Sequence, residues 1–208
     1  MNLSGETKLF LGVIIGTIAI IVLAAVIMSK PTPPAPAYTR NQLIPIGANT
    51  KGNASASAFL VEFSDFQCPS CKAFSSVVES LTEKYKDKLF FAYRHFPLDQ
   101  HPFSRTAAAA AEAAGKQGKF FEAGTYFFAN QTNFSDEFFA KAASVLALDA
   151  TLYEKDRNSN DTKKKIDDDR FFSDTARLPG TPTFFLNGKQ LILYDSSELV
   201  KAVDEAVK

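Results

Sequence analysis

Cysteine is scarce in this sequence: the chain of 208 residues contains two, Cys68 and Cys71, separated by Pro69 and Ser70. Two cysteines exclude the disulfide framework of a small secreted scaffold, and a chain of this length can bury a core without such bridges. We therefore interpret the single CxxC motif as a chemical site rather than a structural staple.

An excess of positive charge is also missing, because 23 Lys and Arg residues balance 23 Asp and Glu residues. This balance gives no basic surface of the kind that binds nucleic acid, so we exclude a nucleic-acid partner. Apolar residues make up 46% of the chain, which is typical of a globular protein. The length fits one folded domain of about 150 to 170 residues.

Charge is absent altogether from Leu9 to Met28, a run of twenty residues. At a rise of about 1.5 Å per residue, a helix of this length matches the hydrocarbon core of a bilayer. We predict a short N-terminal segment at 1–8 and a transmembrane anchor at 9–28. A cleavable signal peptide is the alternative, since Ala-Pro-Ala at 35–37 resembles a cleavage site, but its apolar region is normally about 7 to 15 residues long.

The charges that flank this apolar segment do not decide its topology. Lys8 is the side-chain cation before it, whereas Lys30, Arg40 and Lys51 follow it. This distribution mildly opposes export of the C-terminal part, although long soluble domains are translocated against such a count.

Proline is concentrated just after the apolar segment. Four prolines between residues 31 and 36 favour an extended spacer without a core of its own. A second loose stretch, at 47–57, is rich in Gly, Ala, Ser and Asn. We predict a stalk at 29–50 and a folded domain at 51–208.

Within this domain, the apolar pattern predicts an order of elements. A strand at Ala58–Phe66 leads through CPSC into a helix, and a second strand follows at Lys88–Phe96. Four helical segments come next, and Asn187–Gly188 then marks a β-hairpin before a last amphipathic helix at Ser196–Val207. The four helical segments are predicted at Ser104–Gly115, Phe120–Ala129, Ser135–Leu148 and Thr151–Phe172.

This order is that of an α/β thioredoxin fold with a helical insertion, which we place near 102–178. The stretches EFSDFQCPSC, YRHFPL followed by HP, AAEAAGKQGKFFEA and PGTPTFFLNGK resemble the DsbA-like thiol:disulfide oxidoreductases, particularly their membrane-anchored, BdbD-like branch. They cover most of residues 58–190, and the stalk and anchor lie outside the resemblance. The resemblance implies a redox-active disulfide between Cys68 and Cys71 and no metal or organic cofactor.

The residue types of the motif suit that chemistry. Cys68 stands at the amino end of a helix, where free N–H groups and the helix dipole favour a thiolate, so we predict that it is the nucleophile. Cys71 lies one turn further in and is the resolving thiol, and Pro69 suits the first helical turn. Ser70 stands where several DsbA proteins carry histidine, and without that positive charge we expect a weaker oxidant.

Three further residues are assigned roles by the resemblance. Glu62 matches the buried acid beneath the active site and would exchange a proton with Cys71; a solvated glutamate at a strand edge is the alternative. Pro182 in GTPT matches the loop whose cis-proline faces the CxxC motif. Thr181 before it would pair with an extended substrate and contact the sulfurs.

A zinc site is the competing interpretation of a CxxC motif. His95 and His101 follow it, but the spacing from Cys71 exceeds that of a zinc finger and the sequence has no second cysteine pair. We therefore expect no metal and regard both histidines as structural or surface groups.

We expect a membrane-tethered thiol:disulfide oxidoreductase whose catalytic domain lies outside the cytoplasm, at the cell surface or in the periplasm. Its expected partners are cysteine-containing exported proteins and a membrane protein that reoxidises it, and we expect a monomer. A tethered reductase or isomerase, and a non-catalytic peptide-binding domain, are the alternatives. The sequence leaves open the direction of electron flow, the substrates and the reoxidising partner.

Overall fold

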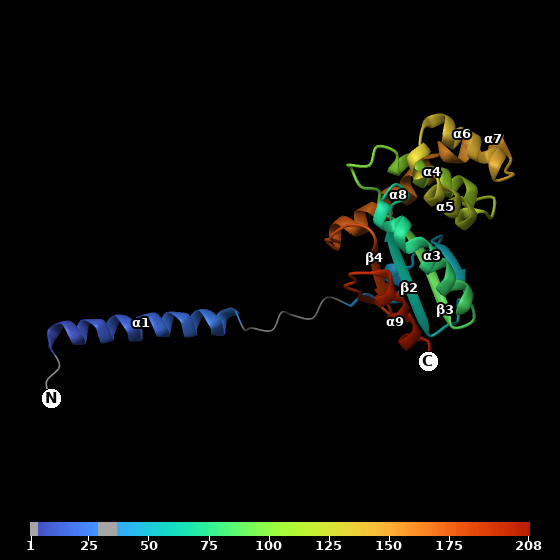
Figure 1. Ribbon diagram of the computed structural model, residues 1–208. Helices are drawn as coiled ribbons and strands as arrows, with labels where there is room; N and C mark the ends of the chain where they lie inside the picture. Colours follow the sequence, from blue (N-terminus) through green and yellow to red (C-terminus); the bar gives the residue numbers. More distant parts are fainter. Residues whose placement is uncertain (1–3, 29–36) are drawn as a thin grey trace. The chain divides into compact units, whose positions relative to one another are not determined.

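The computed structural model describes residues 4–28 and 37–208, and the chain divides into two compact units, up to residue 35 and from residue 36 (Figure 1). The first unit holds helix α1 (Gly5–Met28). Its segment Gly5–Ala25 is long and apolar enough to cross a membrane, with a mean hydropathy of 2.5, although a signal sequence satisfies the same criteria. The four prolines of the predicted stalk lie outside the described residues.

The second unit is built on a five-stranded sheet with the order β1-β3-β2-β4-β5. Strands β2 and β3 are parallel, and the other neighbouring pairs are antiparallel. The parallel pair is joined by a helical crossover, as that geometry requires. The strands are β1 (Asn49–Gly52), β2 (Ala58–Ser64), β3 (Leu89–His95), β4 (Thr183–Leu186) and β5 (Lys189–Gln190).

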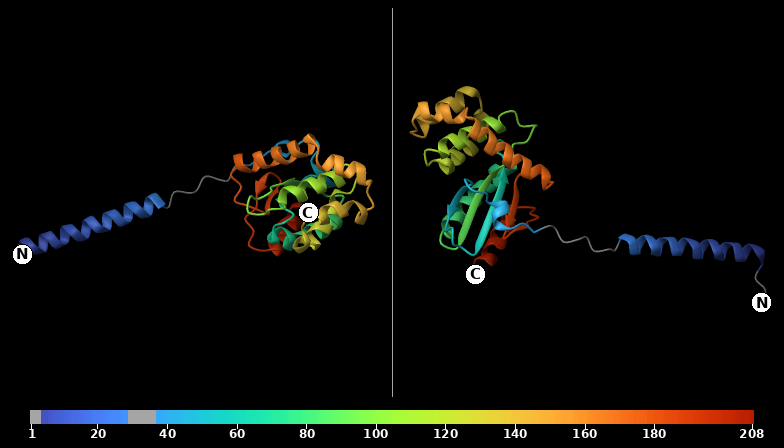
Figure 2. Two further views of the ribbon diagram at one scale, coloured as in Figure 1. Left: turned by 90° about the horizontal axis from the view of Figure 1, so that it is seen from above. Right: turned by 180° about the vertical axis from the view of Figure 1, so that it is seen from behind.

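Helices cover both faces of this sheet. The crossover α3 (Pro69–Lys84) and the C-terminal α9 (Ser196–Ala206) lie on one face, and α8 lies on the other (Figures 1 and 2). The chain between β3 and β4 is helical, and Figure 1 shows α4–α7 grouped beyond one end of the sheet. These helices are α4 (Ser104–Gly115), α5 (Phe120–Ala129), α6 (Asp136–Val145), α7 (Ala150–Arg157) and α8 (Asn160–Thr175), with a 3-10 turn at Gln131–Asn133.

Alternation along the strands divides the core into two clusters. Leu60 of β2 and Tyr93 of β3 belong to the cluster under α3, whereas Val61 and Phe63 belong to the cluster on the opposite face. Because side chains two apart on a strand share a face, Glu62 lies on the side of Leu60, beneath α3. The sheet thus carries a carboxyl group under the helix that begins at the CxxC motif.

The folded unit includes residues 37–50, ahead of the start predicted at residue 51. Thr39 caps the short helix α2 (Arg40–Leu43) with a capping box, and Leu43 is fully buried. Strand β1 begins at Asn49 and pairs with β3. The sequence there resembles a linker because its pairing comes from tertiary contacts rather than from local residue preference.

The helix predicted over Thr151–Phe172 is two helices, α7 and α8. Helix α7 ends at Arg157, and the hydroxyl of Ser159 then accepts a hydrogen bond from the backbone N–H of Thr162 as the N-cap of α8. A serine that satisfies a free N–H group in this way favours a new helix start over continuation.

Candidate active site

The two cysteines lie where β2 gives way to α3. Cys68 is the N-cap residue of α3, with extended backbone angles (φ −75°, ψ 124°), and Pro69 occupies the first turn, where it has no N–H group to leave unpaired. Both cysteines are free thiols. Cys68 has 6% of its surface exposed and Cys71 has none, so the sulfur of Cys68 is the one that a substrate reaches first.

The environment shifts the pKa values of the two thiols in opposite directions. The Cys71 thiol donates a hydrogen bond to Cys68 and, with smaller help from Thr181 and the backbone of Ser70, lowers the pKa of Cys68 to about 5 against the opposing effect of burial. Burial raises the pKa of Cys71 well above its usual value, and its bond to Cys68 and the charge of Glu62 raise it further. The pair therefore combines a stable thiolate with a protonated partner.

The loop before β4 faces the motif. The Thr181–Pro182 peptide bond is cis, and the sulfur of Cys68 lies 3.5 Å from the carbonyl oxygen of Thr181. The loop thus places a backbone carbonyl against the nucleophilic sulfur, and the side chain of Thr181 helps to lower the pKa of Cys68.

Glu62 lies beneath the motif on β2, which is an inner strand of the sheet. It is 3% exposed, so it is not the solvated edge residue that we considered as the alternative. Burial raises its pKa to about 7, an effect that the hydroxyl of Ser64 opposes only in part. One oxygen of Glu62 has no partner among the described residues. A carboxyl group of this kind changes protonation near neutral pH.

Asp65, just before the motif, holds the turn in place, and the sequence analysis assigned it no role. Its carboxylate accepts hydrogen bonds from the backbone N–H groups of Gln67 (2.8 Å) and Leu98 (3.0 Å) and from Nδ1 of His101 (2.8 Å). His101 therefore has a structural role, as predicted. Asp65 lies inside the stretch EFSDFQCPSC, and its place in that motif was the signal that could have marked it as a site residue.

Two glutamines tie the same turn to the helical insertion. The side-chain amide of Gln131 donates to the carbonyl oxygens of Phe66 (2.8 Å) and Cys68 (2.9 Å). The side-chain oxygen of Gln67 accepts from the backbone N–H of Phe103 (2.7 Å). Gln131 stands outside every motif that we quoted, so no local signal marks it.

His95 does not approach the cysteines as a metal ligand. It is 1% exposed, and its Nε2 lies 2.8 Å from Oε1 of Glu112. Among residues 4–28 and 37–208, no group of three or more His, Cys, Asp or Glu side chains is arranged to hold a metal ion.

Comparison with known families identifies the folded unit. A family model described as Thioredoxin matches residues 47–205. The chain belongs to the thioredoxin family.

Solved thioredoxin-like structures share this fold. The thiol-disulfide exchange protein α-DsbA2 from Wolbachia pipientis is 23% identical, with a TM-score of 0.72 over 79% of this chain and 90% of that one. The catalytic domain of Proteus mirabilis ScsC is 22% identical, with a TM-score of 0.70 over 80% and 93%. BdbD from Bacillus subtilis is 21% identical, with a TM-score of 0.67 over 77% and 93%. The thioredoxin fold with a helical insertion is therefore confirmed.

The curated relatives of this thioredoxin-family chain are named as antiporters. "Na(+)/H(+) antiporter NhaA 1" of Mycobacterium sp. (strain KMS) is 34% identical over 158 residues, which are 74% of this chain and 26% of the relative. "Na(+)/H(+) antiporter NhaA 1" of Mycolicibacterium gilvum (strain PYR-GCK) is 31% identical over 160 residues, again 26% of its length. The chain thus spans about a quarter of the length of these relatives.

Proposed function

We propose that this protein is a membrane-tethered thiol:disulfide oxidoreductase that introduces disulfides into exported proteins through Cys68 and Cys71. The observation that carries the proposal is the opposite perturbation of the two thiols, with the pKa of Cys68 lowered to about 5 and that of Cys71 raised. A thiolate that is stable at neutral pH is a good leaving group, and a buried neutral thiol is held in reserve to resolve a mixed disulfide.

In the oxidising direction, a substrate thiolate attacks the sulfur of Cys68, and the bond to Cys71 breaks with its electron pair on the Cys71 sulfur. Glu62, whose pKa is about 7, supplies the proton that neutralises this leaving thiolate. A second substrate thiolate then attacks the substrate sulfur of the mixed disulfide and expels Cys68 as a thiolate. The substrate gains a disulfide and the cysteine pair takes up two electrons, so the exchange requires no metal or organic cofactor.

The low pKa of Cys68 supports an oxidase over a reductase. Stabilising the thiolate stabilises the reduced form, which makes the disulfide more oxidising. A pKa of about 5 lies between values of about 7 for thioredoxin and about 3.5 for DsbA. We therefore expect a moderate oxidant, as the serine at position 70 also indicates. A tethered reductase or isomerase that uses the same two cysteines is the alternative.

The proposed location is the outer side of a membrane, with α1 as the tether. The length and apolar composition of α1 support a single span, and disulfide formation belongs to oxidising compartments. The sequence motifs place the chain nearest the membrane-anchored, BdbD-like branch in this proposal, and BdbD shares its fold. The proposed partners are cysteine-containing exported proteins and a membrane protein that reoxidises the pair, and we propose a monomer. Since the chain spans about a quarter of the antiporters, antiport is not extended to it.

The deciding experiment is the reduction potential of the Cys68–Cys71 pair in the full chain, titrated against glutathione with thiol trapping as the readout. We expect a value between about −120 and −180 mV, the range from DsbA to protein disulfide isomerase. A value near that of thioredoxin, about −270 mV, would mean that the protein mainly reduces its targets.

Replacing the nucleophile separates catalysis from simple peptide binding. Cys68→Ser should abolish turnover of a peptide disulfide, because Cys71, the other cysteine of the sequence, is fully buried. Ser70→Ala keeps both sulfurs and should retain turnover, which makes it the matched control. Turnover that survived Cys68→Ser would show that Cys68 is not the nucleophile. Peptide binding without turnover in the unaltered chain, kept in Cys68→Ser, would favour the non-catalytic peptide-binding domain.

A further inference from the structure

Two carbonyl groups of the turn at the CxxC motif are held by one side chain of the helical insertion. Nε2 of Gln131 donates hydrogen bonds to the carbonyl oxygens of Phe66 (2.8 Å) and Cys68 (2.9 Å). The carbonyl of Cys68 also accepts the backbone N–H of Lys72 (3.1 Å), as the N-cap residue of α3 does for the first bond of the helix. Both N–H groups of the amide are thus used at this turn.

The segment that carries Gln131 is itself anchored. Gln131 begins the 3-10 turn that follows α5, and the backbone N–H of Asn133 donates to the carbonyl of Asn130 (2.9 Å) within that turn. Phe127 before the turn and Phe134 after it are buried in the core, with 0% and 8% of their surfaces exposed. These contacts fix the position of the amide in the absence of a substrate.

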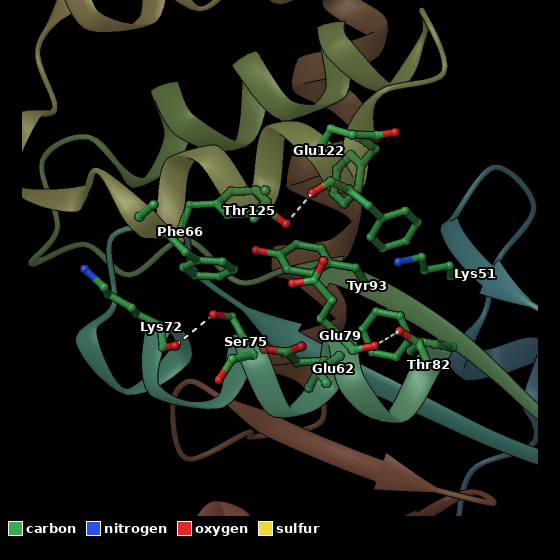
Figure 3. A pocket seen from close by; sticks show the side chains of 18 of the residues that line it. Lys51, Glu62, Phe66, Lys72, Ser75, Glu79, Thr82, Tyr93, Glu122 and Thr125 are labelled. Carbon is green, nitrogen blue, oxygen red and sulfur yellow. Dashed lines mark hydrogen bonds between the residues drawn. The ribbon is translucent and has the colours of Figure 1, made fainter. Parts of the chain in front are cut away.

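Packing of side chains leaves part of the space between the turn and the insertion unfilled. The ring of Phe66 stacks on Tyr93 (4.9 Å between ring centroids) and contacts Phe128 of α5 (5.1 Å). Figure 3 shows Phe66 and Tyr93 between α3 and α5, at a cavity of about 660 Å³ that these helices line. Because protein interiors are normally close-packed, the two bonds of Gln131 supply a constraint that packing does not supply here.

The geometry of this turn acts on the sulfur of Cys68. The pKa of Cys68 is lowered to about 5 mainly by the Cys71 thiol, against the opposing effect of burial, with smaller contributions from Thr181 and from the backbone N–H groups of Cys71 and Ser70. Rotation about ψ of Cys68 moves its carbonyl and the first turn of α3 together, relative to its sulfur. A donor that fixes this carbonyl therefore also fixes where those N–H groups lie.

We propose that Gln131 is a positioning residue for thiol–disulfide exchange: by holding the carbonyl groups of Phe66 and Cys68, it keeps the first N–H groups of α3 directed at the Cys68 sulfur. The inference deepens the proposed function and rests on it, because it gives the helical insertion a part in the exchange. Gln131 acts through the backbone of Cys68 and not on a sulfur. Without its amide, the thiolate is less stable and the disulfide is less oxidising.

The test replaces Gln131 in the full chain, held in lipid nanodiscs. Gln131→Met keeps the approximate length of the side chain without its N–H groups, so it should raise the pKa of Cys68 by about half a unit to one unit. The ultraviolet absorbance of the thiolate in the reduced protein, followed from acid to alkaline pH, measures this shift. The equilibrium constant with glutathione should change about threefold to tenfold toward a more stable disulfide, which is about 15 to 30 mV. An unchanged pKa of Cys68 would overturn the proposal.

Gln117→Met is the matched control. Gln117 also belongs to the insertion and is half-buried, and its side-chain amide exchanges two hydrogen bonds with the backbone of Asp149, before α7 (3.2 and 2.9 Å). Both substitutions should lower the melting temperature by similar amounts, but only Gln131→Met should move the pKa of Cys68. An equal shift of this pKa in both variants would assign the effect to general destabilisation and overturn the proposal.

Gln131→Glu provides a second variant that keeps the shape of the side chain. A carboxylate accepts hydrogen bonds without donating them, and its charge opposes a nearby thiolate. This variant should therefore raise the pKa of Cys68 by more than Gln131→Met does, and a pKa equal to that of the unaltered chain would contradict the proposal. Absence of disulfide turnover in the unaltered chain would refute the proposed function and this inference with it. Normal turnover together with an unaltered pKa and potential in both variants would refute the role of Gln131 alone.

Discussion

Burying the carboxyl group of Glu62 in the core costs free energy. It is 3% exposed and one of its oxygens is unpaired, and an apolar side chain would fill the place at lower cost. Burial raises its pKa to about 7, so it can take a proton from Cys71 and return it within the same range of pH. Proton transfer accounts for a buried acid at this position better than stability does.

Glu62→Gln keeps the shape of the side chain and removes its ability to take a proton. In the unaltered protein, the rate at which Cys71 resolves a mixed disulfide on Cys68 should rise as the pH passes through about 7, because the carboxylate form accepts the thiol proton. The variant should lose this inflection and be slower by about 100-fold above it. Stopped-flow release of a fluorescent peptide linked to Cys68, followed from acid to alkaline pH, measures both effects.

The control for this experiment is Glu79→Gln, which changes an exposed glutamate of α3. It should behave like the unaltered protein. An inflection that persisted in Glu62→Gln would show that another group accepts the proton.

Among the elements, the carboxylate of Glu112 connects the helical insertion to the sheet. Glu112 of α4 accepts hydrogen bonds from Asn49 of β1, His95 of β3 and Lys165 of α8. Burial alone would raise the pKa of Glu112, but His95 and Lys165 more than offset it and lower the pKa to about 2. The insertion is thus fixed to the sheet by charge as well as by apolar packing.

Glu112→Gln should destabilise the fold in a pH-dependent way. Since the pKa of Glu112 is lowered on folding from 4.5 to about 2, its contribution is present above pH 4.5 and is lost as the pH falls toward 2. We expect the free energy of unfolding to drop by about 3 kcal/mol at neutral pH and by much less near pH 2. Urea unfolding followed by circular dichroism at both pH values measures this difference.

Glu122→Gln, on the exposed surface of α5, provides the matched control and should change stability by less than about 0.5 kcal/mol. An equal loss for Glu112→Gln at both pH values would point to lost packing instead of lost charge.

The sequence predicts the elements whose signals are local and misses those that depend on distant partners. The CPSC turn, the apolar strand before it and the Asn187–Gly188 hairpin can each be predicted from about ten consecutive residues. Gln131 lies 63 residues from Cys68, and Glu112 is 63 residues from Asn49. Such contacts exist only after α4 and α5 have packed against the sheet, and no local pattern encodes them.

For the molecule as a whole, the segment before residue 51 belongs to the fold. Leu43 is fully buried in the cluster on the α8 face of the sheet. The ring of Tyr38 packs against Phe172 (5.4 Å between ring centroids) and Phe185 (5.5 Å) in the same cluster. This segment therefore completes the hydrophobic cluster on the α8 face of the sheet.

Two truncated chains test this boundary. A chain of residues 37–208 should melt at the temperature of the full chain, because both cores are complete. A chain of residues 51–208 should lose about 3 kcal/mol or more, since it lacks Leu43 and the first two residues of β1. Thermal unfolding by circular dichroism, together with the thiol reactivity of Cys68, measures the difference.

Leu43→Ala in the full chain separates the lost side chain from the lost backbone, and it should cost about 2 to 5 kcal/mol. Identical melting of the two truncated chains would mean that residues 37–50 add nothing to the fold.

The place where the chain enters the folded unit determines how mechanical load reaches the redox centre. The backbone N–H of Tyr38 donates to the carbonyl of Gly188 (2.8 Å), and the backbone N–H of Asn187 donates to the carbonyl of Phe59 (2.9 Å), near the start of β2. Cys68 follows the other end of this seven-residue strand, about 20 Å away. A force applied to the N-terminal segment therefore acts first on the β4–β5 hairpin and the start of β2. The length of β2 separates these contacts from the two sulfurs.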